Sequence, residues 1–319
     1  MPYNTQMTES GVSSLIPEDV ASEILLDIPR MNPVLAMSRR LPNMSRAQRR
    51  MPVMSALATA YFVNGRTGLK QTTSVSWEDK YIDAEEIAVI VPIAQSLLDD
   101  ADYDIWGNVR PEISRAFSVA ITGALLYGTN IPATWSTNLG AAGLVTLAGS
   151  VSAAAYTDLY EAILGETAAA TSGLYGCIEE DGFMVTGNIA DLSMRRKLRN
   201  VRDSDGNPIF KRSMQDSTVY ELDGSPIYFP TDGTITSASS LMIAGQWDQL
   251  VYAMRQDITY TIADQGVIQD GTGAIVYNLF QQDMVALRAV MRLGVALPNP
   301  INRVQPTAGS RCAFKVLVA

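Results

Sequence analysis

The sequence predicts an α+β fold, and three stretches carry that prediction. Residues 104–128 repeat apolar side chains at steps of three and four, which is the pattern of one face of a helix. Residues 285–295 alternate between two sets of side chains, one of which contains both arginines of the stretch, as a long half-buried strand does. Residues 52–82 resemble a two-stranded excursion.

We expect the helix between Asp104 and Gly128 to be buried by other elements. One apolar row along it consists of Trp106, Val109, Ile113, Ala116, Ala120, Ala124 and Tyr127, and a second row beside it consists of Phe117, Ile121 and Leu125. Only its first half has a polar face, because no charged side chain follows Arg115 until Asp158. Pro111 marks either the start of the helix or a bend in it. The apolar run from residue 116 to residue 128 is shorter than the roughly 20 residues of a membrane span, so we expect a core helix.

Residues 1–51 are predicted to form an N-terminal arm and a first helix. Residues 1–15 are polar, and the helix is expected from Pro17 to Ile28. The next stretch carries six arginines and no acidic residue: Arg30, Arg39, Arg40, Arg46, Arg49 and Arg50. Two interpretations remain open for it. It is an inward-facing patch for nucleic acid or an acidic partner, or it is an exposed arm that pairs with acidic neighbours.

Residues 52–82 are predicted to form a long hairpin. Val53–Val63 is one arm, Asn64 and Gly65 form the turn, and Gln71–Trp77 is the return. Both arms are rich in Ala, Thr and Ser, so the hairpin cannot build a core of its own, and an isolated two-stranded ribbon is marginal in water. We therefore expect it to rest on another molecule, with an ordinary surface hairpin as the alternative.

Residues 83–155 lead into the long helix and out of it. A strand is expected from Ile87 to Val91 and a short helix after Pro92. Residues 129–155 are uncharged and rich in Ala, Gly, Thr and Ser, which predicts a loop and a domain boundary.

Residues 156–240 have mixed helix and strand signals. We expect a helix over 157–170, a short strand over 183–187 and a second helix over 191–200, followed by turns at 205–208 and 223–226. The basic side chains expected on the exposed face of the second helix are Arg195, Arg196, Lys197, Arg199 and Arg202. Farther on, residues 258–262 alternate as a strand does.

Composition argues against several classes of function. The chain of 319 residues has a formal charge of −9, which makes it a poor general binder of duplex DNA, because phosphate contacts need cationic surface. It contains no histidine, which removes histidine-based catalysis and histidine metal ligation. Cys177 and Cys312 are far apart and are expected to be reduced and buried. The polar N-terminus lacks a secretory signal, which predicts synthesis in the cytoplasm.

The common ligand-binding and catalytic motifs are absent or incomplete. The acidic run Asp100–Asp104 resembles the opening of a calcium loop, but Ile105 and Pro111 occupy the positions of the required glycine and glutamate. The run Asp203–Asn207 fails in the same way at Pro208. The sequence has no phosphate-binding GxxxxGK[ST], no GxGxxG and no GxSxG. We therefore predict no catalytic residue, no metal site and no cofactor, and interpret the carboxylate clusters as solvated faces and helix caps.

Six phrases, taken in order along the chain, resemble the major capsid proteins of tailed bacteriophages, which have the Hong Kong 97-type fold. The phrases are Ile16-PEDVASEIL, Ala84-EEIAVIVPIAQSLLDDADYDIW, Arg110-PEISRAFSVAITGALLYG, Leu198-RNVRDSDGNPIF, Leu222-DGSPIYF and Asp283-MVALRAVMRLGVAL. The resemblance covers nearly the whole chain. It rests on arrangement and on local phrases rather than on a catalytic signature.

The resemblance implies a division of the chain into five segments. They are residues 1–51 as N-terminal arm and first helix, 52–82 as the extended loop (E-loop) that overlies a neighbouring subunit, 83–132 as the peripheral (P) domain with the spine helix, 133–240 as the axial (A) domain, and 241–319 as the return to the P-domain and the C-terminus. The implied function is self-assembly into the hexamers and pentamers of an icosahedral shell around a double-stranded DNA genome. Such a protein is not an enzyme, is assembled in the host bacterial cytoplasm and is part of the virion.

The implied partners are other copies of the chain, a portal protein, packaged double-stranded DNA without sequence specificity, and a decoration protein, with no membrane. Because the first helix is expected to begin at Pro17, we expect a separate scaffolding protein rather than a fused scaffolding segment. The candidate assembly-interface residues are Arg39, Arg40, Arg46, Arg49, Arg50, Asn64, Gly65, Arg66, Lys70, Arg195, Arg196 and Arg199. Some members of the family cross-link an E-loop lysine to an asparagine of a neighbour. Lys70 lies near the loop tip, but no partner asparagine can be assigned, so we expect no cross-link.

Two alternatives remain at this point. An encapsulin-type shell of a bacterial compartment has the same fold, and the nucleic acid or protein content of the particle would separate it from a phage capsid. A histidine-free α/β enzyme that uses carboxylates would form small oligomers and no shells.

Overall fold

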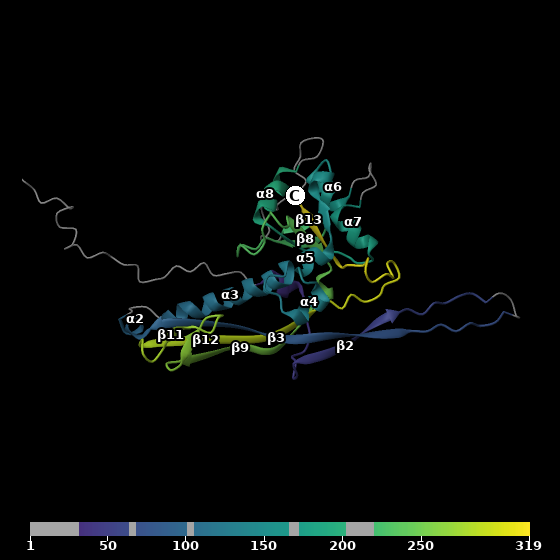
Figure 1. Cartoon of the computed structure of the whole chain (residues 1–319). Helices are drawn as coiled ribbons and strands as arrows, with labels where there is room; N and C mark the ends of the chain where they lie inside the picture. Colours follow the sequence, from purple (N-terminus) through teal and green to yellow (C-terminus); the bar gives the residue numbers. More distant parts are fainter. Residues whose placement is uncertain (1–31, 64–67, 101–104, 166–171, 202–219) are drawn as a thin grey trace, which may run out of the picture.

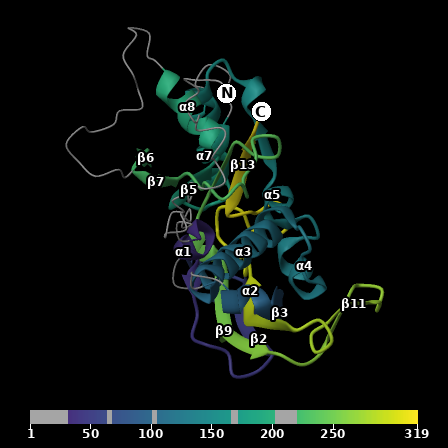
Figure 2. The ribbon, with the colours of Figure 1, turned by 90° about the vertical axis from the view of Figure 1, so that its left-hand side faces the viewer.

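Two large β-sheets with helices packed on them, and a smaller two-stranded ribbon, form the framework of the chain (Figure 1). The computed structural model describes residues 32–63, 68–100, 105–165, 172–201 and 220–319. The longer sheet and helix α3 (Ile105–Tyr127) form an elongated lower layer, and the second sheet with its helices stands above it. In the perpendicular view, α3 lies between this upper layer and the long strands (Figure 2). The predicted α+β class is confirmed.

The lower layer is a five-stranded sheet. In spatial order its strands are β1 (Arg39–Arg40), β9 (Val251–Ala263), β12 (Met284–Ala296), β3 (Ser76–Ala94) and β2 (Gln48–Ala56). Strand β12 pairs antiparallel with β3 on one side and with β9 on the other, so it is the centre of the sheet. The two strands predicted around 258–262 and 285–295 are confirmed, and both are longer than expected. A separate ribbon of β10 (Val267–Gln269) and β11 (Ile275–Asn278) connects them.

Strand β3 is longer than the sequence indicated. The predicted return arm of the hairpin and the predicted strand from Ile87 to Val91 are parts of one strand of 19 residues. Charged side chains from Glu78 to Lys80 hide this continuity in the sequence, because this half of β3 pairs only with β2 and exposes most of its side chains. The short helix expected after Pro92 is α2 (Gln95–Asp100).

Helix α3 confirms the predicted long helix, with Pro111 inside it rather than at its start. Its buried side chains are Ile113, Phe117, Ile121, Thr122, Ala124, Leu125 and Leu126. The expected core helix is confirmed, but one side of it faces solvent, since Ala116 and Ala120 of the first predicted row are exposed. Ile113 and Ala124 of the first row are buried together with the second row, so the core face of the helix includes side chains of both rows. Within the residues that the structure describes, no helix has both the length and the apolar character needed to cross a membrane.

The loop predicted over residues 129–155 is wrong, because this stretch forms short elements. They are α4 (Ala133–Leu139), α5 (Gly143–Ala148), β4 (Ser150–Ser152) and the 3-10 helix η3 (Ala153–Ala155). Buried side chains such as Trp135 and Leu144 hold them against the core. The glycines that suggested a loop end the helices instead: Gly140 and Gly149 follow α4 and α5 with positive φ angles of 79° and 74°.

The upper layer is a six-stranded sheet. In spatial order its strands are β4, β13 (Phe314–Val318), β8 (Met242–Gly245), β5 (Gly187–Ala190), β7 (Ser225–Tyr228) and β6 (Tyr220–Leu222). The helices in this part of the chain are α6 (Leu159–Leu164), α7 (Gly173–Glu180) and α8 (Leu192–Asn200), and two short helices at the join of the layers are α1 (Pro33–Met37) and the 3-10 helix η4 (Trp247–Gln249).

Several predictions for this layer need correction. The strand expected over 183–187 lies four residues later in β5, whose side chains are all buried and therefore show no alternation. Helix α7 was not predicted. The helix expected over 157–170 is the shorter α6, which ends at Leu164 because Gly165 follows it with a positive φ angle of 104°. The turn at 223–226 is confirmed between β6 and β7. Residues 17–28, 202 and 205–208 lie outside the described residues.

The predicted boundary at residue 240 does not separate the two sheets. Strands β8 and β13, which the predicted division returned to the lower layer, pair with each other and belong to the upper sheet. Strand β13 also pairs in parallel with β4. Such pairings join residues far apart in sequence, and short apolar strands give no local signal of their partners. One apolar core spans both layers and includes Trp247 and Phe314, whose rings meet edge to face with centroids 5.1 Å apart.

Leu125→Ala is expected to lower the free energy of unfolding by about 2–5 kcal/mol, because truncation of a core leucine leaves a cavity. The Leu125 side chain is fully buried, whereas Leu97 in α2 is 57% exposed and provides a matched control. Leu97→Ala is expected to change the free energy of unfolding by no more than about 0.5 kcal/mol. Urea unfolding of the purified chain, followed by circular dichroism, measures both. Equal losses at the two positions would contradict the placement of Leu125 in the core.

Candidate assembly interface

The excursion between β2 and β3 extends away from both layers (Figure 1). The two strands pair from Gln48 with Asp83 to Ala56 with Ser76. Beyond them, residues 57–63 and 68–75 run side by side without regular strand structure. Two hydrogen bonds join these arms: the Thr59 amide donates to Thr73 Oγ1 at 3.2 Å, and the Tyr61 hydroxyl donates to the Gln71 carbonyl at 2.9 Å. We call residues 57–75 the arm.

The arm exposes large apolar side chains to solvent. Phe62 is fully exposed, Leu69 is 88% exposed, and Trp77 at the base of the arm is 64% exposed. Burying such a side chain contributes about 1.5–3 kcal/mol, so the arm would gain much from a partner surface. This agrees with the prediction that the hairpin has no core of its own. Of the predicted site residues here, Lys70 is exposed, and Asn64, Gly65 and Arg66 lie outside the described residues.

The arginines of the segment after α1 divide into two groups. Arg49 donates to the carbonyls of Pro42 and Asn43 at 2.7 and 3.0 Å, and Arg50 forms an ion pair with Asp79 at 3.2 Å. These two arginines therefore fasten the segment to itself and to β3. Both arginines of β1 are exposed, as is Arg46; Arg40 donates to Asn43 Oδ1 at 3.3 Å. Arg30 lies outside the described residues.

The basic helix α8 lies at the top of the upper layer, away from the arm (Figure 1). Asp191 caps its start by accepting from the Ser193 amide at 3.0 Å. Arg196 and Arg199 are exposed as predicted, but Arg195 is half-buried and does not belong to the exposed face. Lys197 and Arg199 lie in the last turn, where the helix dipole favours positive charge. The structure therefore does not bring the predicted basic sites together.

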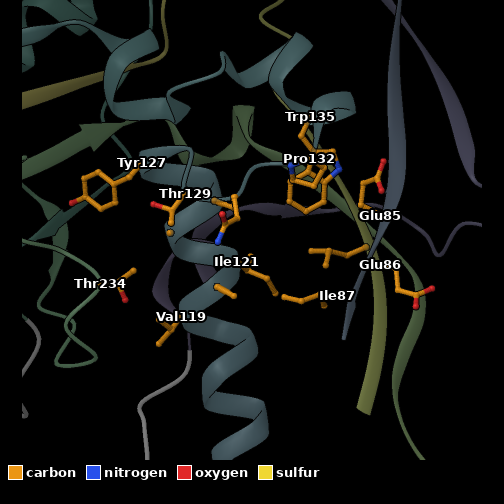
Figure 3. Close-up of a pocket in the computed structure, with 15 residues that line it drawn as sticks. Glu85, Glu86, Ile87, Val119, Ile121, Tyr127, Thr129, Pro132, Trp135 and Thr234 are labelled. Carbon is orange, nitrogen blue, oxygen red and sulfur yellow. The ribbon is translucent and has the colours of Figure 1, made fainter. Parts of the chain in front are cut away.

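A groove of about 410 Å³ runs along the last turns of α3 and was not foreseen from the sequence (Figure 3). Val119 and Ile121 of the helix, Ile87 of β3 and Trp135 of α4 give it apolar walls. Glu85 lies at its edge and accepts from the Thr134 hydroxyl at 2.6 Å. The lining comes from four separate stretches of the chain, which explains why no sequence pattern indicates it. A mainly apolar lining of this kind is typical of pockets in which apolar groups are buried.

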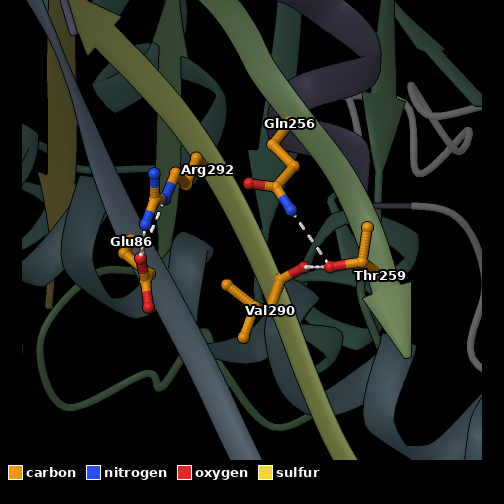
Figure 4. A network of polar contacts seen from close by, with 5 residues as sticks. All are labelled: Glu86, Gln256, Thr259, Val290 and Arg292. Carbon is orange, nitrogen blue, oxygen red and sulfur yellow. Dashed lines mark hydrogen bonds and ion pairs between the residues drawn. The ribbon is translucent and has the colours of Figure 1, made fainter. Parts of the chain in front are cut away.

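A polar network joins β3, β12 and β9 beside the groove (Figure 4). Arg292 Nε donates to Glu86 Oε2 at 2.8 Å, and the two side chains form an ion pair. Thr259 Oγ1 accepts from Gln256 at 3.1 Å and donates to the Val290 carbonyl at 3.3 Å. The pairing of β12 with β9 shifts register between Val290 and Arg292, so these side chains satisfy polar groups at an irregular point of the ladder.

The two thiols are not candidates for chemistry. Both cysteines are free; Cys312 is buried, and Cys177 is half-buried rather than buried as predicted. Burial raises the pKa of both thiols above the ordinary value, which favours the unreactive neutral form. Among the residues that the structure describes, no group of three or more Cys, Asp and Glu side chains could hold a metal ion.

Comparison with known proteins gives a consistent picture. The model of the phage capsid family matches residues 13–304. The major capsid protein of Staphylococcus phage 80alpha is 24% identical over 306 residues, which cover 93% of this chain and 86% of that protein. A solved structure from Microbacterium phage Oxtober96 has a TM-score of 0.81 at 28% identity and covers 98% of this chain and 99% of its own. The capsid of a native GTA particle has the same fold, with a TM-score of 0.63 at 18% identity over the full length of both chains.

The raised thiol pKa values predict how the cysteines react with a thiol reagent such as Ellman's reagent. In the folded protein, the rate at Cys177 is expected to keep rising with pH beyond the ordinary cysteine pKa of about 8.5, because the thiolate forms only at higher pH. Cys312 is expected to react only after unfolding. The time course of the released chromophore at several pH values measures both rates, and Cys177→Ser assigns them. A plateau in the Cys177 rate below pH 8.5 would contradict the expectation.

Proposed function

Because the chain belongs to the phage capsid family, we propose that its copies assemble into the hexamers and pentamers of an icosahedral shell that encloses double-stranded DNA. The chain is a major capsid protein of a tailed bacteriophage, and its self-association is what such a protein requires. Membership of this structural family supports the phage shell over an encapsulin-type compartment. The sequence contains none of the common catalytic motifs, and this argues against the alternative of a histidine-free enzyme.

The two layers suggest how the subunit is divided. In this proposal α3 and the five-stranded sheet form the P-domain, the six-stranded sheet and helices α6 to α8 form the A-domain, residues 52–82 form the E-loop, and residues 1–51 form the N-terminal arm. The A-domain then includes β8 and β13 from the C-terminal stretch, in place of a boundary at residue 240.

The exposed apolar arm is the single observation that supports this function best. Phe62 and Leu69 are almost fully in water in the isolated subunit, and the arm that carries them extends away from both layers of its own chain. A second copy is the natural partner, because a contact between different surfaces of identical subunits repeats around a closed ring. Many such contacts together stabilise a shell even when each is weak alone.

The charge of the chain fits a container for DNA. With a net charge of −9, the subunit as a whole repels the phosphate backbone, so packed DNA would slide along the inner wall instead of adhering to it. The exposed arginines Arg39, Arg40 and Arg46 are proposed for contacts on the inner surface or between capsomers. Arg49 and Arg50 are proposed to stabilise the fold of the subunit instead, because both bond to other residues of their own chain. A separate scaffolding protein, a portal protein and a decoration protein are the further partners proposed.

Phe62→Ser combined with Leu69→Ser is expected to lower the yield of closed shells by at least about tenfold, because each subunit loses apolar contacts worth more than 1.4 kcal/mol. Folding is expected to stay intact, since both side chains are exposed. Size-exclusion chromatography and electron microscopy measure the yield, and thermal unfolding measures the fold.

Met184→Ser is the matched control, because Met184 is 76% exposed in the upper layer, away from the arm. Normal shells from the double variant would remove the arm from the assembly interface. An absence of shells from the unchanged protein, with its partners present, would overturn the function itself.

Arg39→Glu combined with Arg40→Glu is expected to reduce DNA-filled particles by about tenfold or more, because like charges placed at an interface cost several kcal/mol. Arg255→Glu with Arg288→Glu makes the same change in net charge at exposed positions of the long sheet. Particle counts and DNA content in infected cells give the readout. Equal losses from both pairs would assign the effect to net charge and not to the basic segment.

A further inference from the structure

The connection between β12 and β13, residues 297–313, fastens the upper layer to the base of the arm. In Figure 1 it lies between the upper sheet and the excursion. At its centre is Arg311, which is only 5% exposed and is the one buried arginine or lysine among the described residues. Its guanidinium donates to Asn299 Oδ1 at 3.0 Å and to the carbonyls of Asn299, Gln305 and Pro306 at 2.9, 2.9 and 3.2 Å. A buried arginine bonded to carbonyls in this way holds a loop in one shape.

Asp181, at the end of α7, anchors the same loop to the upper layer. Its carbonyl accepts from Asn302 Nδ2 at 2.7 Å. Its carboxylate accepts from the Cys312 amide at 3.2 Å and forms an ion pair with Lys315 at 3.0 Å. The next residue, Gly182, allows the approach, because a Cβ atom there would lie 2.8 Å from Asn302 Nδ2.

The outer end of the loop reaches the arm. Arg303 Nη2 donates to the carbonyl of Ala58 at 2.8 Å, and the amide of Ile301 donates to the carbonyl of Met54 at 3.4 Å. Strand β2 ends at Ala56, so the bond from Arg303 meets the arm just beyond the last strand pair. The bond from Arg303 therefore links the arm to a part of the chain outside the hairpin. It does so just beyond the paired strands, where no strand pairing fixes the direction of the arm.

We propose that Arg303 and Arg311 are positioning residues that set the angle of the arm relative to the upper layer. Arg311 holds the loop in one conformation, and Asp181 fixes the loop to the upper layer. Arg303 then holds the base of the arm in a fixed position relative to the loop through its bond to Ala58. This inference rests on the proposed function in one respect: the angle of the arm decides whether it meets the next subunit in a ring that closes. A rotation of the upper layer would then move the arm, so contacts made by the two parts are coupled.

Arg303→Ala tests this assignment, because Arg303 is exposed and its loss removes the bond to Ala58 without opening the core. Arg255→Ala removes the same charge from an exposed position in β9 and is the control. Arg303→Lys retains a donor and is expected to restore part of the effect. Arg311 itself is unsuitable as the first variant, since its removal would leave buried carbonyls without donors and unfold the loop.

The first measurement needs no shell. Nitroxide labels at Lys70→Cys in the arm and Lys197→Cys in α8, in a Cys177→Ser background, report the distance between arm and upper layer by pulsed electron resonance on the unassembled subunit. Arg303→Ala is expected to broaden the distance distribution at least twofold with an unchanged thermal unfolding midpoint. A distribution as narrow as that of Arg255→Ala would overturn the inference.

The second measurement counts closed shells by electron microscopy. The expected result is a loss of at least fivefold for Arg303→Ala, partial recovery for Arg303→Lys and no loss for Arg255→Ala. If the distance distribution broadens but shells form normally, the link between arm angle and assembly is wrong. If the unchanged protein forms no shells, the proposed function fails, and the distance measurement still decides the positioning role.

Discussion

The packing of α3 on the long central strand β12 is the interaction on which the rest of the subunit depends. Strand β12 pairs along its length with β3 and β9, and its alternate side chains point toward the helix. The buried face of α3 and the inward-facing side chains of β12 belong to one core. Its members here are Ile113, Phe117, Ile121, Leu125, Leu287, Ala289, Met291 and Leu293. Because this core also includes Trp247 and Phe314, the same packing joins the two layers. A subunit without it would have no fixed frame from which an arm could project.

Strand β3 connects this core layer to the arm. Its second half pairs with β12 and lies in the core layer, while its first half pairs only with β2 and leads into the arm. A single strand of 19 residues thus runs from the core layer to the base of the arm. The ion pair of Glu86 with Arg292 lies where these two halves meet, and Ile82 is buried against Gly294, whose missing side chain permits that close approach. These contacts stabilise the base of the arm, and an exposed two-stranded segment with few hydrogen bonds of its own needs such support to keep its conformation.

Sequence reasoning found the elements whose pattern is long and local. The helix at Ile105–Tyr127 and the strand at Met284–Ala296 repeat their periods often enough to be recognised, and the resemblance to phage capsid proteins placed them in one fold. Short elements such as α4 and α5 were missed, because their glycines imitate a loop and their burial depends on distant partners. The same limit applies to the arginines. Arg311 and Arg39 are alike in sequence, yet one is buried among carbonyls and the other is exposed, and only the fold decides which.

The uneven distribution of charge affects which surface of a second copy attracts the exposed arm. The whole chain carries −9, but the arm contains Arg66 and Lys70 and no acidic residue, so the rest of the subunit is more acidic than the total indicates. Two arms repel each other, and so do two acidic bodies, whereas an arm and a body attract. In the proposed shell, this charge distribution favours a contact between different surfaces of two copies, and such a contact can continue around a ring. With apolar side chains such as Phe62 exposed on the arm, charge selects the orientation of the contact and apolar burial supplies most of its free energy.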